Sequence, residues 1–309
     1  MKIAFFGTSE FAVPSLRGLA EHIDLVVTQP ARPSGRGLKL SASPVEVVAR
    51  ELGLPVESPE KCRAPEFVES IRGGQFDVLL VAAYGQILSQ ALLDSAPYGA
   101  INLHGSILPR HRGAAPIARA ILAGDTITGV TVMQMDRGLD TGDMIAIEET
   151  TIGPDETAGE LTGRLAILAA RMAEEWLPRI IRGEIEHTPQ NEALATYAAK
   201  ITKADAKLSL SQSATETYRR FRAVTPTPGA YFEIADDGAL KVHSMQPIDQ
   251  SGPSGILLTT SPQPVIAVAQ GALELTMVQP HGKRPMSGRD WVNGRRLRPG
   301  DPVGIIGEP

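Results

Sequence analysis

The stretch AINLHGSILPR, Ala100 to Arg110, begins as a short apolar run and turns polar within a few residues. Similar runs precede it, each ending at a glycine or a polar turn: KIAFF at residues 2–6, DLVVT at 24–28 and DVLLVAA at 77–83. Apolar runs without alternation are typical of strands buried on both faces of a parallel sheet. Amphipathic stretches such as residues 44–52 predict helices that cover this sheet, so the first half is predicted to be an α/β domain.

The second half of the chain has a different sequence pattern. From Thr227 onward, short β-like runs are broken by glycine and proline, as in GAYFEI at residues 229–234 and ALELTMV at 272–278. This spacing predicts a small barrel or sandwich of short strands. We therefore expect one domain over residues 1–189, a linker over residues 190–205 and a β-rich domain over residues 206–309.

The composition bounds the kind of protein. A chain of 309 residues that is 42% hydrophobic and 21% charged is typical of a globular protein of two domains. Its single cysteine, Cys62, cannot form an internal disulfide, and no apolar stretch is long enough to span a bilayer, which favours a cytoplasmic protein without membrane association. The net charge is −5, yet residues 281–298 carry six Lys and Arg side chains against one Asp. This basic run indicates either a solvated surface or a patch for a polyanion.

Polar side chains gather where the strand AINLH ends. Asn102 and His104 are two positions apart, so they project from the same face of the strand, at the carboxyl end where α/β sheets bind ligands. The loop after a later strand-like run carries three acids that could meet His104: Asp136, Asp140 and Asp143. An amide, an imidazole and a carboxylate could stabilise an oxyanion and move a proton. The alternative is a hydrogen-bonded core pair without a catalytic role.

Other chemistries are disfavoured by the motifs present. Ser9 and Ala12 occupy the positions of the second and third glycines of a dinucleotide-binding loop that would start at Gly7. Ser106 lies in HGSIL, which is not a nucleophile elbow. His104 and His111 lack the spacing of paired zinc ligands, so no metal is expected. These observations favour direct transfer between two bound substrates.

The segments NLHGSILPRHRGAAP and MDRGLDTGDM resemble the methionyl-tRNA formyltransferase family, and the similarity extends to FFGTSEFAVPSL, TQPARPSGRGLKLSASPV and VAAYGQIL. The resemblance implies an α/β, Rossmann-like formyltransferase domain with a mostly parallel sheet, followed by a small OB-like β-barrel that binds tRNA. It also implies that 10-formyltetrahydrofolate donates a formyl group to the α-amino group of methionyl-initiator tRNA, in the cytoplasm, for translation initiation. We expect no metal to take part, and the expected state is a monomer.

The resemblance assigns roles to particular residues. The residues that match the catalytic Asn, His and Asp of the family are Asn102, His104 and Asp140, the last being the acid of LDTG. The segment that matches the folate-binding SLLP-like stretch consists of Ser106, Ile107, Leu108 and Pro109. The basic residues implied in tRNA binding are Arg36, Lys39, Lys200, Lys203 and Lys207. The chain departs from the family at His111, where an aromatic residue is more usual.

Three alternatives stay open at this point. The first is a related folate-dependent enzyme that formylates a nucleotide sugar or a glycinamide ribonucleotide, and the second is a hydrolase that releases formate. The third is a noncatalytic module that binds tRNA or folate. The loop arginine, Arg36, and the basic C-terminal domain favour a tRNA acceptor, whereas the complete acid–base set argues against a module without catalysis.

Overall fold

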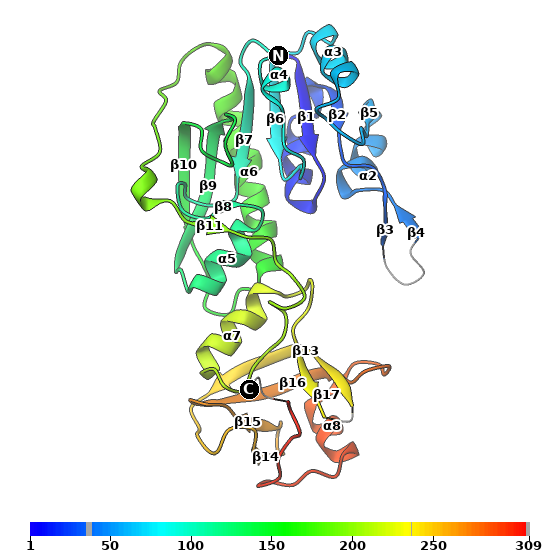
Figure 1. The fold of residues 1–309 in the computed structure, drawn as a ribbon, viewed down its shortest axis with the longest axis vertical. Helices are drawn as coiled ribbons and strands as arrows, with labels where there is room; N and C mark the ends of the chain where they lie inside the picture. Colours follow the sequence, from blue (N-terminus) through cyan, green and yellow to red (C-terminus); the bar gives the residue numbers. More distant parts are fainter. Residues whose placement is uncertain (35–38, 236, 307–309) are drawn as a thin grey trace. The chain divides into compact units, whose positions relative to one another are not determined.

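The computed structural model describes residues 1–34, 39–235 and 237–306, and the chain forms two compact units (Figure 1). Unit 1 comprises residues 1–117, 127–152 and 161–199, and unit 2 comprises residues 118–126, 153–160 and 200–309. Of the expected linker, residues 190–199 therefore belong to unit 1 and residues 200–205 to unit 2. Two short segments of the expected first domain, residues 118–126 and 153–160, also belong to unit 2.

Unit 1 is built on a seven-stranded sheet in the order β10-β9-β7-β6-β1-β2-β5 (Figure 1). Its parallel strands are β1 (Ile3–Gly7), β2 (Ile23–Val27), β5 (Val56–Glu57), β6 (Val78–Ala82) and β7 (Ala100–His104). Two antiparallel strands, β9 (Ile127–Gln134) and β10 (Met144–Thr151), extend the sheet beyond β7. Every residue of β1, β6 and β7 is buried, as the apolar runs predict.

Helices occur between and after these strands in the chain. They are α1 (Val13–Gly18), α2 (Pro44–Glu51), α3 (Pro65–Gly73), α4 (Gln90–Leu93), α5 (Pro116–Ala123) and α6 (Ala158–Ile181), with 3₁₀ turns η1 (Glu10–Ala12), η2 (Ala20–His22) and η3 (Glu192–Leu194). Of these helices, most of α5 and the start of α6 lie in segments that belong to unit 2. Helix α2 starts where the sequence places a cap and a proline, since the Ser43 side chain accepts a hydrogen bond from the Glu46 backbone N–H and Pro44 follows it. Phe67 and Ile71 of α3 pack with Phe6 of β1 in one buried cluster that also contains Cys62.

Two small strand pairs complete unit 1. β3 (Arg32–Ser34) pairs with β4 (Lys39–Ser41) in antiparallel fashion. β8 (Arg112–Gly113) pairs in parallel with β11 (Tyr197–Ala198), which joins the loop after β7 to a segment about 85 residues later. The approach requires glycine at position 113, because an added Cβ there would lie 2.9 Å from the carbonyl oxygen of Ala198.

Unit 2 contains an antiparallel sheet in the order β12-β13-β16-β15-β14, with β17 beside β16. The strands are β12 (Tyr231–Ile234), β13 (Gly238–Ile248), β14 (Leu257–Thr259), β15 (Val265–Ala267), β16 (Ala272–Gln279) and β17 (Met286–Ser287), and the helices are α7 (Ala214–Ala223) and α8 (Gly288–Gly294). The last described residues bond to both edge strands: Ala235 N–H donates to Gly304 O at 2.7 Å, and Leu257 N–H donates to Asp301 O at 3.0 Å. These bonds tie the C-terminal segment to both edges of the sheet, and the architecture confirms an α/β domain followed by a small β domain.

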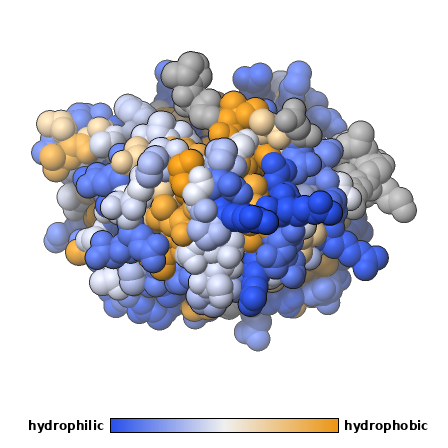
Figure 2. All heavy atoms as spheres, turned by 90° about the horizontal axis from the view of Figure 1, so that it is seen from below, coloured by the Kyte–Doolittle hydropathy of each residue, from blue (hydrophilic) through white to orange (hydrophobic). Residues whose placement is uncertain are grey.

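The surface of the described chain mixes hydrophilic and hydrophobic side chains. On the face that Figure 2 shows, groups of hydrophobic residues are separated by hydrophilic ones. Within the described residues, each helix is too short or too polar to cross a lipid bilayer.

Candidate active site

Asn102 and His104 lie at the carboxyl end of β7, which runs between β6 and β9 in the sheet of unit 1. Both side chains project from the same face of the strand, and both are buried, with 8% and 5% of their surface exposed. A buried amide and a buried imidazole require hydrogen-bond partners. Those partners come from two loops that follow the ends of β7 and β9.

Asp140, in the loop between β9 and β10, reaches both side chains. Asn102 Nδ2 donates a hydrogen bond to Asp140 Oδ1 at 3.4 Å, and His104 Nδ1 lies 3.7 Å from Asp140 Oδ2. The backbone N–H of Gly113 donates to the same Oδ2 at 2.8 Å. The structure thus brings Asn102, His104 and Asp140 into one cluster, in which the carboxylate is 13% exposed.

The other two acids of this loop have different surroundings. Asp136 Oδ1 accepts hydrogen bonds from the Gly138 backbone N–H at 3.0 Å and from the Thr141 hydroxyl at 2.7 Å, so Asp136 stabilises the turn of its own loop. Asp143 contributes its backbone carbonyl, which accepts from Gln134 N–H at 2.9 Å. Asp140 is therefore the carboxylate that contacts the Asn102–His104 pair.

The backbone determines which nitrogen of His104 carries a proton. His104 Nε2 lies 3.0 Å from the carbonyl oxygen of His111. A carbonyl oxygen can only accept a hydrogen bond, so Nε2 must be the protonated nitrogen. The Nδ1 atom then faces the carboxylate of Asp140, and a second proton on the ring would lie next to that negative charge. The ring is therefore held in one orientation, with Nδ1 toward Asp140.

The segment Ser106–Pro109, which directly follows β7, is held tightly by the protein itself. The buried hydroxyl of Thr131, in β9, donates to the Ser106 carbonyl at 2.7 Å and accepts from Leu108 N–H at 3.1 Å. The Ser106 hydroxyl donates to the Arg110 carbonyl at 2.7 Å, and the Leu108–Pro109 peptide is cis. Ser106, Leu108 and Pro109 are buried, and Ile107 is half-buried. The segment lies beside the Asn102–His104 pair, and its Ser106 hydroxyl is hydrogen-bonded to the protein backbone.

His111 serves the site through its backbone. Its carbonyl orients His104, and its N–H donates to the Thr196 hydroxyl at 2.8 Å. The residue has a φ of 59° and is 7% exposed, so its ring is not displayed on the surface.

A buried cation that the sequence analysis missed lies next to these loops. Arg112 has a fully buried side chain, and its guanidinium donates to Gln190 and to Glu192. Hydrogen bonding to Glu192 raises the pKa of Arg112, and the same contact lowers the pKa of the Glu192 carboxyl. Sequence reasoning could not find this cluster, because its members are about 80 residues apart and two of them lie in the expected linker.

The basic residues implied in tRNA binding have different surroundings. Arg36 lies outside the described residues, and Lys39 begins β4, where only the backbone is described. Lys200 and Lys203 are exposed in unit 2. Lys207 is partly buried and its ammonium donates to Glu233 Oε2 at 2.7 Å.

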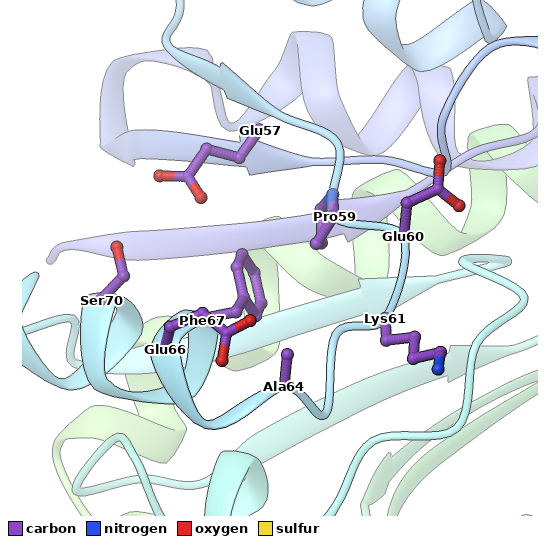
Figure 3. Close-up of a pocket in the computed structure, with 8 residues that line it drawn as sticks. All are labelled: Glu57, Pro59, Glu60, Lys61, Ala64, Glu66, Phe67 and Ser70. Atoms are coloured by element: carbon purple, nitrogen blue, oxygen red, sulfur yellow. The ribbon is translucent and has the colours of Figure 1, made fainter.

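A separate hollow of about 440 Å³ lies on unit 1, between the end of β5 and α3 (Figure 3). It is lined by Glu57, Pro59, Glu60, Lys61, Ala64, Glu66, Phe67 and Ser70. It shares no residue with the Asn102–His104–Asp140 cluster. Within residues 1–34, 39–235 and 237–306, no three His, Cys, Asp or Glu side chains are grouped so that they could hold a metal ion.

The fold is that of a formyl transferase. A family model described as formyl transferase matches residues 1–181, and a model described as formyl transferase, C-terminal domain, matches residues 200–296. The chain therefore belongs to the formyl transferase family, and within it to the methionyl-tRNA formyltransferases, whose members match it over almost its whole length.

Three relatives illustrate this likeness. The methionyl-tRNA formyltransferase of Sorangium cellulosum is 46% identical, with 98% of this chain and all of that protein covered. That of Citrifermentans bemidjiense is 44% identical, with all of this chain and 97% of that protein covered. Among solved structures, WlaRD, a sugar 3N-formyl transferase, has a TM-score of 0.66 at 17% identity, covering 92% of this chain and 99% of that one. At this identity the last likeness shows a shared fold.

Proposed function

We propose that this enzyme transfers the formyl group of 10-formyltetrahydrofolate to the α-amino group of methionyl-initiator tRNA. The observation that carries the proposal is the convergence of Asn102, His104 and Asp140 at the carboxyl end of β7, in a chain that resembles methionyl-tRNA formyltransferases from end to end. A folate donor is supported by WlaRD, whose structure was solved in the presence of 5-N-formyl-THF. The product, N-formylmethionyl-tRNA, serves translation initiation, which places the enzyme in the cytoplasm.

The reaction joins the methionyl nitrogen to the formyl carbon and breaks the bond between that carbon and N10 of the folate. The amine attacks the carbonyl and forms a tetrahedral intermediate whose oxygen is negative. The amino group loses a proton, and N10 gains one as it leaves. The protein must therefore stabilise an oxyanion and provide a route for one proton.

Each residue of the cluster has a role in this scheme. One N–H of the Asn102 amide contacts Asp140, which leaves the second N–H of that amide to donate to the oxyanion. A proton on His104 Nδ1 adds positive charge next to the same oxygen, and the Asp140 carboxylate stabilises that charge. Asp140 also accepts the proton that the attacking ammonium loses. One well-placed donor of this kind lowers a barrier by about 3 kcal/mol.

The two substrates take different surfaces in this proposal. The folate lies against the segment Ser106–Pro109, next to the reacting carbonyl, where the backbone and the half-buried Ile107 supply its contacts. The tRNA contacts are assigned to Arg36 and Lys39, to the exposed lysines Lys200 and Lys203, and to Lys207 in a lesser role because of its ion pair. We assign catalysis to residues 1–189 and tRNA binding to residues 206–309.

The deciding experiment compares acceptors in one formylation assay with labelled 10-formyltetrahydrofolate. Methionyl-initiator tRNA should be formylated much faster than methionyl-elongator tRNA. A dTDP-amino sugar and glycinamide ribonucleotide serve as rival acceptors, and release of free formate serves as the test for a hydrolase. Faster formylation of either rival, or formate release without any acceptor, would contradict the proposal.

A further inference from the structure

We propose that Gln190 is a positioning residue that holds Asp140 in its catalytic geometry. The role of Asp140 itself rests on the proposed function above. Gln190 lies 50 residues after Asp140 in the chain, in the segment that the sequence marks only as a linker. In the structure this segment folds back against the loops of the active site.

The amide of Gln190 joins two backbone carbonyls of the Asp140 loop. Its Nε2 atom donates to the carbonyl oxygens of Asp140 and Gly142, both at 2.8 Å. Asp140 needs such support, because its φ of 55° lies in the left-handed region, which side-chain-bearing residues rarely adopt. Both hydrogens of the amide therefore hold a backbone conformation that would otherwise relax.

The other end of the Gln190 amide is fixed by Arg112. Gln190 Oε1 accepts from Arg112 Nε at 2.9 Å and from Arg112 Nη2 at 2.7 Å. A guanidinium only donates hydrogen bonds and a carbonyl only accepts them. The amide oxygen of Gln190 must therefore face Arg112, and its nitrogen must face the two carbonyls. Glu192 takes further N–H groups of Arg112, from Nη1 at 2.9 Å and from Nη2 at 2.6 Å, and holds the cation in turn.

Asp140 is thus held from two directions by neighbouring residues of one strand. Arg112 holds its backbone through Gln190, and Gly113 donates directly to its carboxylate at 2.8 Å. This arrangement aims Asp140 at Asn102 and His104. Because Gln190 contacts Asp140 through the backbone and not through the reacting groups, its effect should fall on the chemical step and not on substrate binding.

The test is a pair of substitutions that separate the two ends of the amide. Gln190→Glu keeps an oxygen that can accept from Arg112. It replaces the Nε2 donor with a second oxygen, which faces the carbonyls of Asp140 and Gly142. Gln190→Met removes both the oxygen acceptor and the nitrogen donor with a side chain of similar size. It is the second variant, to be used if Gln190→Glu folds poorly. Asn191→Ala, at the exposed neighbouring position, is the matched control, because the Asn191 side chain bonds only locally to Ala193 N–H in the described structure.

Gln190→Glu should slow single-turnover formylation by about tenfold to a hundredfold, with the KM values of both substrates within about twofold of the wild type. Asn191→Ala should behave as the wild type. In an Asp140→Ala background, the same substitution at Gln190 should cost little more, since the group that it positions is gone. A full additional loss in that background, or a change in KM alone, would refute the positioning role.

A second readout does not depend on the acceptor. Backbone amide hydrogen exchange in residues 137–143 should be faster in Gln190→Glu than in the wild type, because the loop has lost its brace. Unchanged exchange together with an unchanged rate would overturn the inference. If the wild type formylated another acceptor, the proposed function would fail, while the exchange measurement would still decide the role of Gln190.

Discussion

The Oδ2 atom of Asp140 lies 2.8 Å from the backbone N–H of Gly113, although 27 residues separate them in the chain. The other oxygen of the same carboxylate accepts from Asn102 Nδ2 at 3.4 Å. Both oxygens therefore face donors, and both must act as acceptors. A carboxylate can accept a hydrogen bond at both of its oxygens, whereas a side-chain amide offers one acceptor oxygen and one donor NH₂ group.

This relationship leads to a prediction for Asp140→Asn. Whichever way the new amide turns, its NH₂ group faces either Gly113 N–H or Asn102 Nδ2, so one contact becomes repulsive and the charge beside His104 is lost. Single-turnover formylation should fall by at least about a hundredfold. Asp143→Asn, in the same loop, is the control and should retain nearly full activity. Equal rates for the two variants would show that Asp140 has no special role.

Thr131→Val tests how the proposed folate segment is held. The hydroxyl of Thr131 is fully buried and joins the Ser106 carbonyl to Leu108 N–H. Valine keeps the volume but leaves both groups unpaired, which should destabilise the fold by about 1–3 kcal/mol. The KM for 10-formyltetrahydrofolate should rise several-fold, with little change in the KM for charged tRNA. Thr128→Val, on the same strand, controls for stability, and equal changes in both KM values would contradict the assignment.

The lysines of unit 2 should differ in their contribution to tRNA binding. Lys200 and Lys203 are exposed, whereas Lys207 is paired with Glu233. The double substitution Lys200→Ala and Lys203→Ala should weaken tRNA binding and reduce the slope of log K against log salt by about 0.7–0.9 per lost phosphate contact. Lys207→Ala should have a smaller effect on both quantities. The measurement is a salt series of binding isotherms, and an unchanged slope in the double variant would place the tRNA elsewhere.

The start of α7 provides a prediction about pH. Hydrogen bonds from the Ser213 hydroxyl and backbone N–H hold the pKa of the Glu216 carboxyl below its ordinary value. A lowered pKa means that the stabilisation is present above the ordinary pKa of about 4.5 and is lost as the pH falls through the lower, folded-state value. Glu216→Ala should therefore lower the melting temperature at neutral pH, and the difference should shrink in acid. Asp249→Ala is the exposed control, and a difference that persists below the folded-state pKa would contradict the linkage.

Much of the fold could be predicted from local pattern. The run AINLH is apolar on both sides of Asn102, so it had to be a strand buried on both faces, and its polar residues had to lie at a ligand-binding edge. The choice among Asp136, Asp140 and Asp143 could not be made from the residues alone. It depends on how the loop between β9 and β10 folds, including the left-handed backbone at Asp140, which the local sequence does not specify.

The hydrogen-bonded cluster of Arg112, Gln190 and Glu192 could not be predicted from the sequence for a related reason. Arg112 is a charged residue, and charged residues are expected at the surface, yet it is fully buried because Gln190 and Glu192 satisfy its donors. Those partners lie about 80 residues away in a polar segment without periodicity. Contacts between residues so far apart in the chain arise from tertiary packing. The polar sequence of residues 190–205 gives no sign of them.

The most direct test of the account is single-turnover formylation of methionyl-initiator tRNA by Asn102→Ala and His104→Ala, measured beside the wild type at saturating substrate. We predict that each substitution slows the chemical step by at least about a hundredfold, because each removes a group that stabilises the developing oxyanion. A near-normal rate for either variant would contradict it.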